Sequence, residues 1–128
     1  MKALYLLTLG LGLLPPVHAA WAQTSSSLYT QAQAEAGAGL YVQDCAMCHG
    51  DALAGKTFVK PETSPTIGEI FSTMVTSMPL DQPGSLTHEQ YQNIMAYALN
   101  KSFYPAGSKK LTFDHALTDS RPFVNKAQ

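Results

Sequence analysis

The sequence has few cysteines, few charges and no long apolar run. Its 128 residues include only two cysteines, Cys45 and Cys48, so its sulfur chemistry is confined to one pair. Charged residues make up 13% and the net charge is −1, and nothing in that balance indicates the basic surface that nucleic-acid phosphates require. The apolar run at 3–14 would form a helix of about 18 Å, well short of a hydrocarbon core of about 30 Å. No alternating pattern is long enough to build a sheet. The sequence therefore predicts one small helical domain.

The N-terminal segment has the three parts of a secretory signal peptide. Lys2 gives it a positive start, residues 3–14 are apolar, and small residues follow a proline pair. We expect residues 1–22 to be a signal peptide that is cleaved after Ala19 or Ala22. Export predicts a periplasmic protein with no transmembrane segment after cleavage. In that oxidising compartment, two cysteines form a disulfide by default.

Helical patterns dominate the rest of the chain. We expect a flexible leader at 23–30 and one domain at 31–128, with an irregular tail from about residue 101. Apolar spacing predicts helices over the later part of 28–42, over 66–75 and over 87–99. Prolines and a glycine predict a turn at 77–85, and the tail has room for a turn of helix near 115–117.

Single residues mark where two of these helices begin or pack. Thr87 and Gln90 have the spacing of a capping box at the start of the third helix. Gly37 and Gly39 each weaken the first helix by about 1 kcal/mol relative to alanine. A glycine kept inside a helix often allows another backbone to come close, so we expect a second helix to cross here.

The segment Cys45-Ala46-Met47-Cys48-His49 has the C-x-x-C-H spacing of a c-type haem attachment site. Thiols three residues apart can each form a thioether with one porphyrin vinyl group, and the adjacent imidazole can bind the iron. Three alternatives use the same residues: a disulfide, a thioredoxin-like redox pair and a zinc site. The redox pair expects a preceding strand, and zinc expects four ligands, so haem is favoured.

The chain resembles class I cytochromes c over about residues 37–99. Gly37 stands eight residues before Cys45 and Tyr41 stands four before it, and Tyr97 is the natural aromatic partner of Tyr41 across two crossing helices. The segment Ser77-Met78-Pro79 resembles the loop that carries the axial methionine. The stretch from 66 to 100, followed by Tyr-Pro-Ala-Gly, is similar to small cytochrome c domains that serve quinoprotein (PQQ) dehydrogenases.

This resemblance implies an all-α class I cytochrome c fold around one covalent haem c. Cys45 and Cys48 would carry the haem, and His49 and Met78 would be the axial iron ligands. Met74 and Met95 lie on apolar helix faces, where methionine usually fills the core, and His88 is a further rival ligand. The family often has a Gly-Pro after the haem motif to orient the histidine ring, and this loop lacks it, so a carbonyl within 50–60 must accept that proton. The expected apolar core is Leu40, Tyr41, Phe58, Ile67, Ile70, Phe71, Tyr91, Ile94, Tyr97 and Leu99.

The expected function is one-electron transfer rather than catalysis. Two axial side chains leave no open iron position, so oxygen and peroxide have nowhere to bind. We expect redox protein partners, namely a donor dehydrogenase and an acceptor oxidase or cytochrome, and a place as a subunit of a dehydrogenase complex is consistent with this function. The alternative is a haem enzyme or ligand sensor with an open sixth position, and a third hypothesis is a thiol protein without haem. Four lysines could edge a docking surface: Lys56, Lys60, Lys109 and Lys110.

Overall fold

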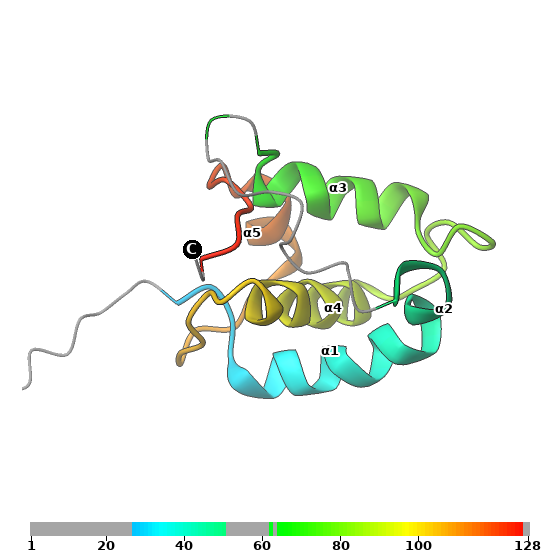
Figure 1. Ribbon diagram of the computed structural model, residues 1–128, viewed down its shortest axis with the longest axis horizontal. Coiled ribbons are helices and arrows are strands. Elements are labelled where there is room, and N and C mark those ends of the chain that lie inside the picture. Colours follow the sequence, from blue (N-terminus) through cyan, green and yellow to red (C-terminus); the bar gives the residue numbers. More distant parts are fainter. Residues whose placement is uncertain (1–26, 51–61, 63, 127–128) are drawn as a thin grey trace, which may run out of the picture.

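The computed structural model describes residues 27–50, 62 and 64–126, and these form five helices (Figure 1). The helices are α1 (Gln31–Asp44), α2 (Ala46–His49), α3 (Ile67–Ser77), α4 (His88–Lys101) and α5 (Phe113–Thr118). Within these described ranges there is no strand, only an isolated bridge between Thr66 and Pro122. The all-α fold class is confirmed, and the three helices predicted from apolar spacing are α1, α3 and α4.

The three long helices each begin with a threonine capping box. The side chain of Thr87 accepts from the backbone of Gln90, and the side chain of Gln90 accepts from the backbone of Thr87, as the spacing predicts. Thr30 and Thr66 begin α1 and α3 in the same way. Each cap satisfies backbone N–H groups that a helix start leaves unpaired and contributes about 1 kcal/mol. The helix starts are therefore encoded locally.

Helices α1 and α4 cross in close contact at Gly37. A Cβ atom on Gly37 would lie 1.8 Å from the carbonyl oxygen of Asn93, so only glycine fits. One turn further along, the rings of Tyr41 and Tyr97 pack with their centroids 5.2 Å apart. The predicted close approach is confirmed at Gly37 but not at Gly39, where a Cβ atom would meet nothing within 4 Å, and the predicted aromatic pair is confirmed. This crossing fixes the end of α1, where the cysteine motif begins.

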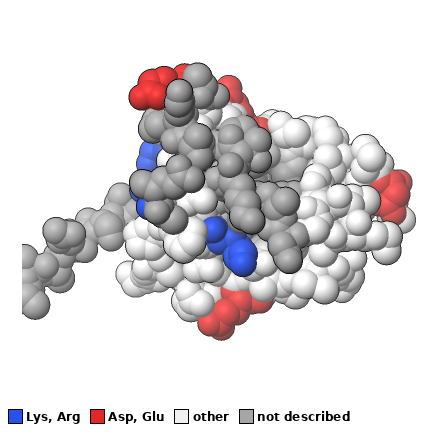
Figure 2. Space-filling view, viewed as in Figure 1, with Lys and Arg blue, Asp and Glu red and all other residues white. Residues whose placement is uncertain are grey.

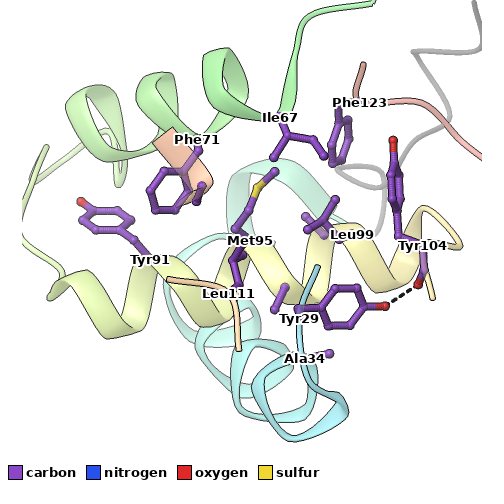
Figure 3. Packing of buried hydrophobic residues seen from close by; sticks show 13 residues of the cluster. Tyr29, Ala34, Ile67, Phe71, Tyr91, Met95, Leu99, Tyr104, Leu111 and Phe123 are labelled. Atoms are coloured by element: carbon purple, nitrogen blue, oxygen red, sulfur yellow. Dashed lines mark hydrogen bonds between the residues drawn. The ribbon is translucent and has the colours of Figure 1, made fainter. Parts of the chain in front are cut away.

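The core lies between α1, α3, α4 and the tail (Figure 3). Six expected core residues are buried and three are partly buried, while Phe58 lies outside the described residues. The buried ones are Tyr41, Ile67, Phe71, Tyr91, Ile94 and Leu99, and the partly buried ones are Leu40, Ile70 and Tyr97.

The tail after α4 belongs to the core, although its sequence shows no long period. Leu111 and Phe123 are buried, and α5 supplies the predicted turn of helix. The buried Gln33 side chain pairs with both backbone groups of Leu111, donating at 2.9 Å and accepting at 2.8 Å. The N–H of Phe123 donates to the carbonyl of Pro65 at 2.8 Å. These bonds fasten the tail to the starts of α1 and α3.

The described end of the expected leader is packed rather than flexible. Tyr29 is fully buried, and its hydroxyl donates to the carbonyl of Tyr104 at 2.5 Å. Its own carbonyl accepts from the N–H of Gly107 at 2.9 Å. Burial of a large aromatic ring stabilises the fold when the hydroxyl has a hydrogen-bond partner, as it has here. Residues 1–26, which include the expected signal peptide, lie outside the described residues.

Asp119 gives the junction of the tail and α3 a testable pH dependence. Burial alone would raise the pKa of Asp119, but hydrogen bonds and charge from Arg121, with a further contribution from His115, hold it below its usual value. Because the folded-state pKa is lowered, this stabilisation is complete above the unfolded-state pKa of about 3.9 and is lost as the pH falls through the folded-state value. We expect Asp119→Asn to lower the free energy of unfolding by about 1 kcal/mol at pH 7, discounted for the exposed Arg121 partner.

Urea unfolding at pH 7 and at a series of lower pH values measures the difference in the free energy of unfolding between the wild type and Asp119→Asn. The gap between the wild type and Asp119→Asn should close as the pH falls. Asp114→Asn, on the exposed first turn of α5, is the control and should change stability by less than about 0.5 kcal/mol. A gap that stays constant down to the acid limit contradicts the assigned role.

Candidate functional site

The motif residues occupy a sharp change of direction between α1 and α2. Cys45 has φ −129° and ψ −36°, which ends α1 and lets a new four-residue helix begin. The carbonyl of Cys45 accepts from the N–H of Cys48 at 3.2 Å and from the N–H of His49 at 3.0 Å. Cys45, Cys48 and His49 therefore lie within about one turn of backbone, and Figure 1 shows that turn, α2, directly after the end of α1.

Both cysteines are free thiols in this structure. Cys45 is half-buried and Cys48 is exposed, and no disulfide joins them. Burial raises the pKa of the Cys45 thiol, and the negative charge of Asp44 raises it further. The pair therefore keeps two separate sulfur atoms, one close to the protein and one facing outward. The disulfide alternative gains no support from this geometry.

Met78 lies where α3 ends, and its backbone is held from two sides. Its carbonyl accepts from the hydroxyl of Tyr91 at 2.7 Å and from the N–H of Gly84 at 3.4 Å. Met95 is fully buried, and Met74 is partly buried and packed against the core. Among these three methionines, only Met78 stands in a loop, as the prolines that follow it, Pro79 and Pro83, predict.

His88 is engaged elsewhere. Its ring stacks on Phe113 of α5 with centroids 3.7 Å apart, and Phe113 in turn meets Phe71 of α3 edge to face. These rings connect the starts of α4 and α5 to the middle of α3. His88 is exposed at the first residue of α4, as its position in the sequence predicts, and the stacking adds a structural partner.

The described residues suit a haem better than a zinc ion. In that part of the chain, no three His, Cys, Asp or Glu side chains converge on one point where they could hold a metal ion. The helix α2 buries none of its residues, and Met47 is 97% exposed, so the apolar and sulfur-bearing turn has an uncovered face. Two thiols, an imidazole and a loop thioether are the donor set that haem c uses. The residues present therefore fit that group.

The expected carbonyl acceptor for the His49 ring falls almost wholly outside the described residues. Of the loop 50–60, the structure describes only Gly50. The carbonyl of Gly50 accepts from the hydroxyl of Tyr41 at 2.6 Å. This bond attaches the chain after the motif to α1. Lys56 and Lys60, expected at a docking surface, also lie outside the described residues.

Tyr91 is a site residue that sequence reasoning placed only in the core. Its ring is buried, while its hydroxyl reaches across to the Met78 loop. We expect Tyr91→Phe to lower the free energy of unfolding by about 1 kcal/mol, because the Met78 carbonyl loses its shorter hydrogen bond. Amide hydrogen exchange at Gly84 should become faster as the loop loosens.

Tyr97→Phe is the matched control, since it removes a hydroxyl from the same helix and keeps the ring pair with Tyr41. Equal exchange rates at Gly84 in the two variants would contradict the role of Tyr91 in holding the loop. The sequence offered no signal for this contact because it joins residues 13 positions apart through a loop.

Comparison with known families identifies the fold and its chemistry. Residues 32–97, just over half of the chain, match the family model described as cytochrome c oxidase, cbb3-type, subunit III. The matched stretch includes the cysteine motif, Met78 and Tyr97. No curated protein and no solved structure gave a match.

None of the helices in the described residues is long and apolar enough to cross a bilayer.

The match covers α1, α2, α3 and most of α4, and it leaves out the tail. Cytochromes c of this kind bind haem c covalently and transfer electrons to and from redox partners. The chain belongs to this family of cytochrome c domains, with an all-α class I cytochrome c fold and a role in haem-based electron transfer.

Proposed function

We propose that this protein is a periplasmic one-electron carrier with a single covalent haem c and axial ligands His49 and Met78. The observation that carries the proposal is the placement of two free thiols and an imidazole on one uncovered turn, α2. Cys45 and Cys48 would form the thioethers. Residues 1–22 would act as the signal peptide, removed after Ala19 or Ala22, and 31–128 would form the domain.

The cysteine motif is positioned by backbone hydrogen bonds and by the crossing of α1 and α4. The N–H groups of Cys48 and His49 both donate to Cys45, so the three side chains keep a fixed order on the turn. Tyr41 ties α1 to Gly50 just after the motif and packs on Tyr97 of α4. A haem iron held here supplies a reversible one-electron change between the ferric and ferrous states.

The backbone of Met78 is positioned by Tyr91 and by the turn after α3. A thioether is a soft ligand that favours ferrous iron and raises the reduction potential. Two axial side chains also leave no open position for oxygen or peroxide. These properties support electron transfer and argue against a haem enzyme or ligand sensor.

Mass and absorption together test the proposal. The exported protein, made in a host that matures c-type haem, should have the chain mass plus one haem and should show distinct oxidised and reduced spectra. A bare chain mass contradicts the covalent attachment. Ready binding of carbon monoxide by the native protein contradicts the proposed Met78 ligand and favours the sensor.

The electron donor is proposed to be a quinoprotein dehydrogenase, with an oxidase or another cytochrome as acceptor. The support is the resemblance of the Met-Pro loop and the following helix to cytochrome c domains of that kind. This support comes from family resemblance alone, so the test measures electron transfer itself. The carrier should be reduced by such a dehydrogenase at micromolar concentration, and a rate no faster than that of an unrelated cytochrome c contradicts this donor.

A further inference from the structure

Phe103 stands in a backbone position that normally belongs to glycine. It follows the end of α4 and has φ 64°, the only positive φ among the described residues other than glycine. Its N–H donates to Asn100, and the N–H of Tyr104 donates to Leu99, both at 3.0 Å, which closes the helix end. Glycine is preferred there because a Cβ atom strains the left-handed backbone. The local fold therefore gives no reason for a phenylalanine.

The ring of Phe103 is also placed unfavourably with respect to water. It is 61% exposed, while its neighbours Ser102 and Tyr104 are buried. An aromatic side chain contributes most when its area is removed from solvent. Phe103 thus breaks two local rules at once, and such violations are expected at functional sites.

Two lysines lie near Phe103 along the backbone. Lys101 precedes it by two residues, and Lys126 is bonded through its backbone N–H to Ser102 at 3.0 Å. The ammonium of Lys126 lies 4.4 Å from the ring centroid of Tyr104. All three residues are exposed and are joined through Ser102, and they are called here the Phe103 patch.

The Phe103 patch lies in the part of the described chain that carries basic side chains, and Lys109, Lys110 and Arg121 belong to the same part. Every described Lys or Arg lies in 101–126. In residues 27–50, 62 and 64–100, by contrast, all the charged side chains among Lys, Arg, Asp and Glu are Asp or Glu. In Figure 2 blue atoms lie over the left and middle of the visible face, and the right-hand end shows none. In Figure 1 that end contains α2 and the loop after α3. A complementary partner would be acidic.

We propose that the Phe103 patch docks a partner protein that offers an apolar pocket bordered by Asp and Glu side chains. The ring fills the pocket, and Lys101 and Lys126 face the carboxylates. The patch lies at the C-terminal end of α4, which is near the start of α1. Helix α2, with the cysteine motif, follows the other end of α1. Docking at the patch therefore leaves the cysteine motif free. The surface holds the cytochrome to a larger redox assembly, which rests on the carrier function proposed above.

A protein partner fits the patch better than a lipid surface. Membrane-surface segments present several apolar side chains on one face, whereas here a single aromatic ring is flanked by charges. One buried aromatic anchor with a charged rim is the usual form of a protein interface hot spot. A second copy of the chain would have to bring its own Phe103 patch or its acidic end to this surface, and the test below separates that case.

Photo-crosslinking from position 103 in the native host identifies the partner. A photoreactive phenylalanine analogue replacing Phe103 should label one protein at a site rich in Asp and Glu, and the same analogue replacing Leu117 should not label that site. The labelled protein is then purified as the binding probe. Labelling of phospholipid, or of a second cytochrome chain alone, overturns the proposal.

Affinity for that purified protein gives the decisive comparison. We expect Phe103→Gly to weaken binding at least about tenfold and yet raise Tm by about 4 °C, because glycine relieves the strained backbone. Lys101→Gln with Lys126→Gln should weaken binding and reduce its salt dependence. Leu117→Gln, an exposed apolar position on the same tail, is the control and should bind within about twofold of the wild type.

The two proposals fail in distinguishable ways. If Phe103→Gly binds like the wild type while both keep normal oxidised and reduced spectra, the docking proposal alone is overturned. If the wild-type protein carries no haem that can be reduced, the carrier function fails, whatever the binding data show.

Discussion

Replacing Gly37 with alanine is expected to lower the free energy of unfolding by about 3 kcal/mol or more. The added Cβ would lie 1.8 Å from the carbonyl oxygen of Asn93 and 2.4 Å from its carbonyl carbon. Both atoms belong to the backbone of α4, so no side-chain rotation can relieve the overlap. Helices α1 and α4 must move apart, and the packing between Tyr41 and Tyr97 is lost with the contact.

Gly39→Ala is the matched control for this prediction. A Cβ atom on Gly39 would meet nothing within 4 Å. Because alanine favours a helix over glycine by about 1 kcal/mol, this variant should be as stable as the wild type or more stable. Denaturant unfolding followed by circular dichroism measures both variants. Equal destabilisation at positions 37 and 39 would show that helix propensity, rather than the crossing, governs this region.

The sequence predicts the helices well where the determinants are local. The capping box of Thr87 and Gln90 and the apolar face of Tyr91, Ile94 and Met95 predict α4, and these features all hold. The same capping pattern is present in the sequence at Thr30 and Thr66. Helix α1 was harder to delimit because its contact face contains small residues and the buried Gln33 rather than a stripe of large apolar side chains.

The tail could not be predicted because its stability comes from distant partners. Leu111 pairs with Gln33, which is 78 residues earlier, and Tyr104 accepts from Tyr29, which is 75 residues earlier. Neither pairing leaves a periodic signal in the local sequence. The burial of Tyr29, within the expected leader, could not be predicted for the same reason, since its partner Tyr104 lies near the other end of the chain.

The candidate site divides along the same line. The C-x-x-C-H spacing is a local property, so the sequence identifies Cys45, Cys48 and His49 without help from the fold. The hold of Tyr91 on Met78 depends on how α3 and α4 lie together, and the sequence alone showed only a core tyrosine. The Phe103 patch needed a backbone angle and an exposed fraction, which no sequence pattern supplies.

Met78→Ala is expected to abolish the near-infrared iron–sulfur charge-transfer band of the ferric protein. The variant removes the one loop thioether, and its midpoint potential should fall by more than about 60 mV, a tenfold change in a one-electron equilibrium. Carbon monoxide should then bind the reduced variant readily. The fold should survive, because Met78 lies in a loop outside the main core cluster and its backbone carbonyl can still accept from Tyr91.

Met74→Leu separates ligand loss from packing loss. Met74 lies one turn earlier on α3 and packs against the core, and leucine conserves its volume, so stability should change by less than about 1.5 kcal/mol. The charge-transfer band and the potential should stay as in the wild type. A band that persists in Met78→Ala and disappears in Met74→Leu would transfer the ligand role to Met74. If the wild-type protein lacks the band, no methionine binds the iron, and ready binding of carbon monoxide would then favour the open-site alternative over the carrier.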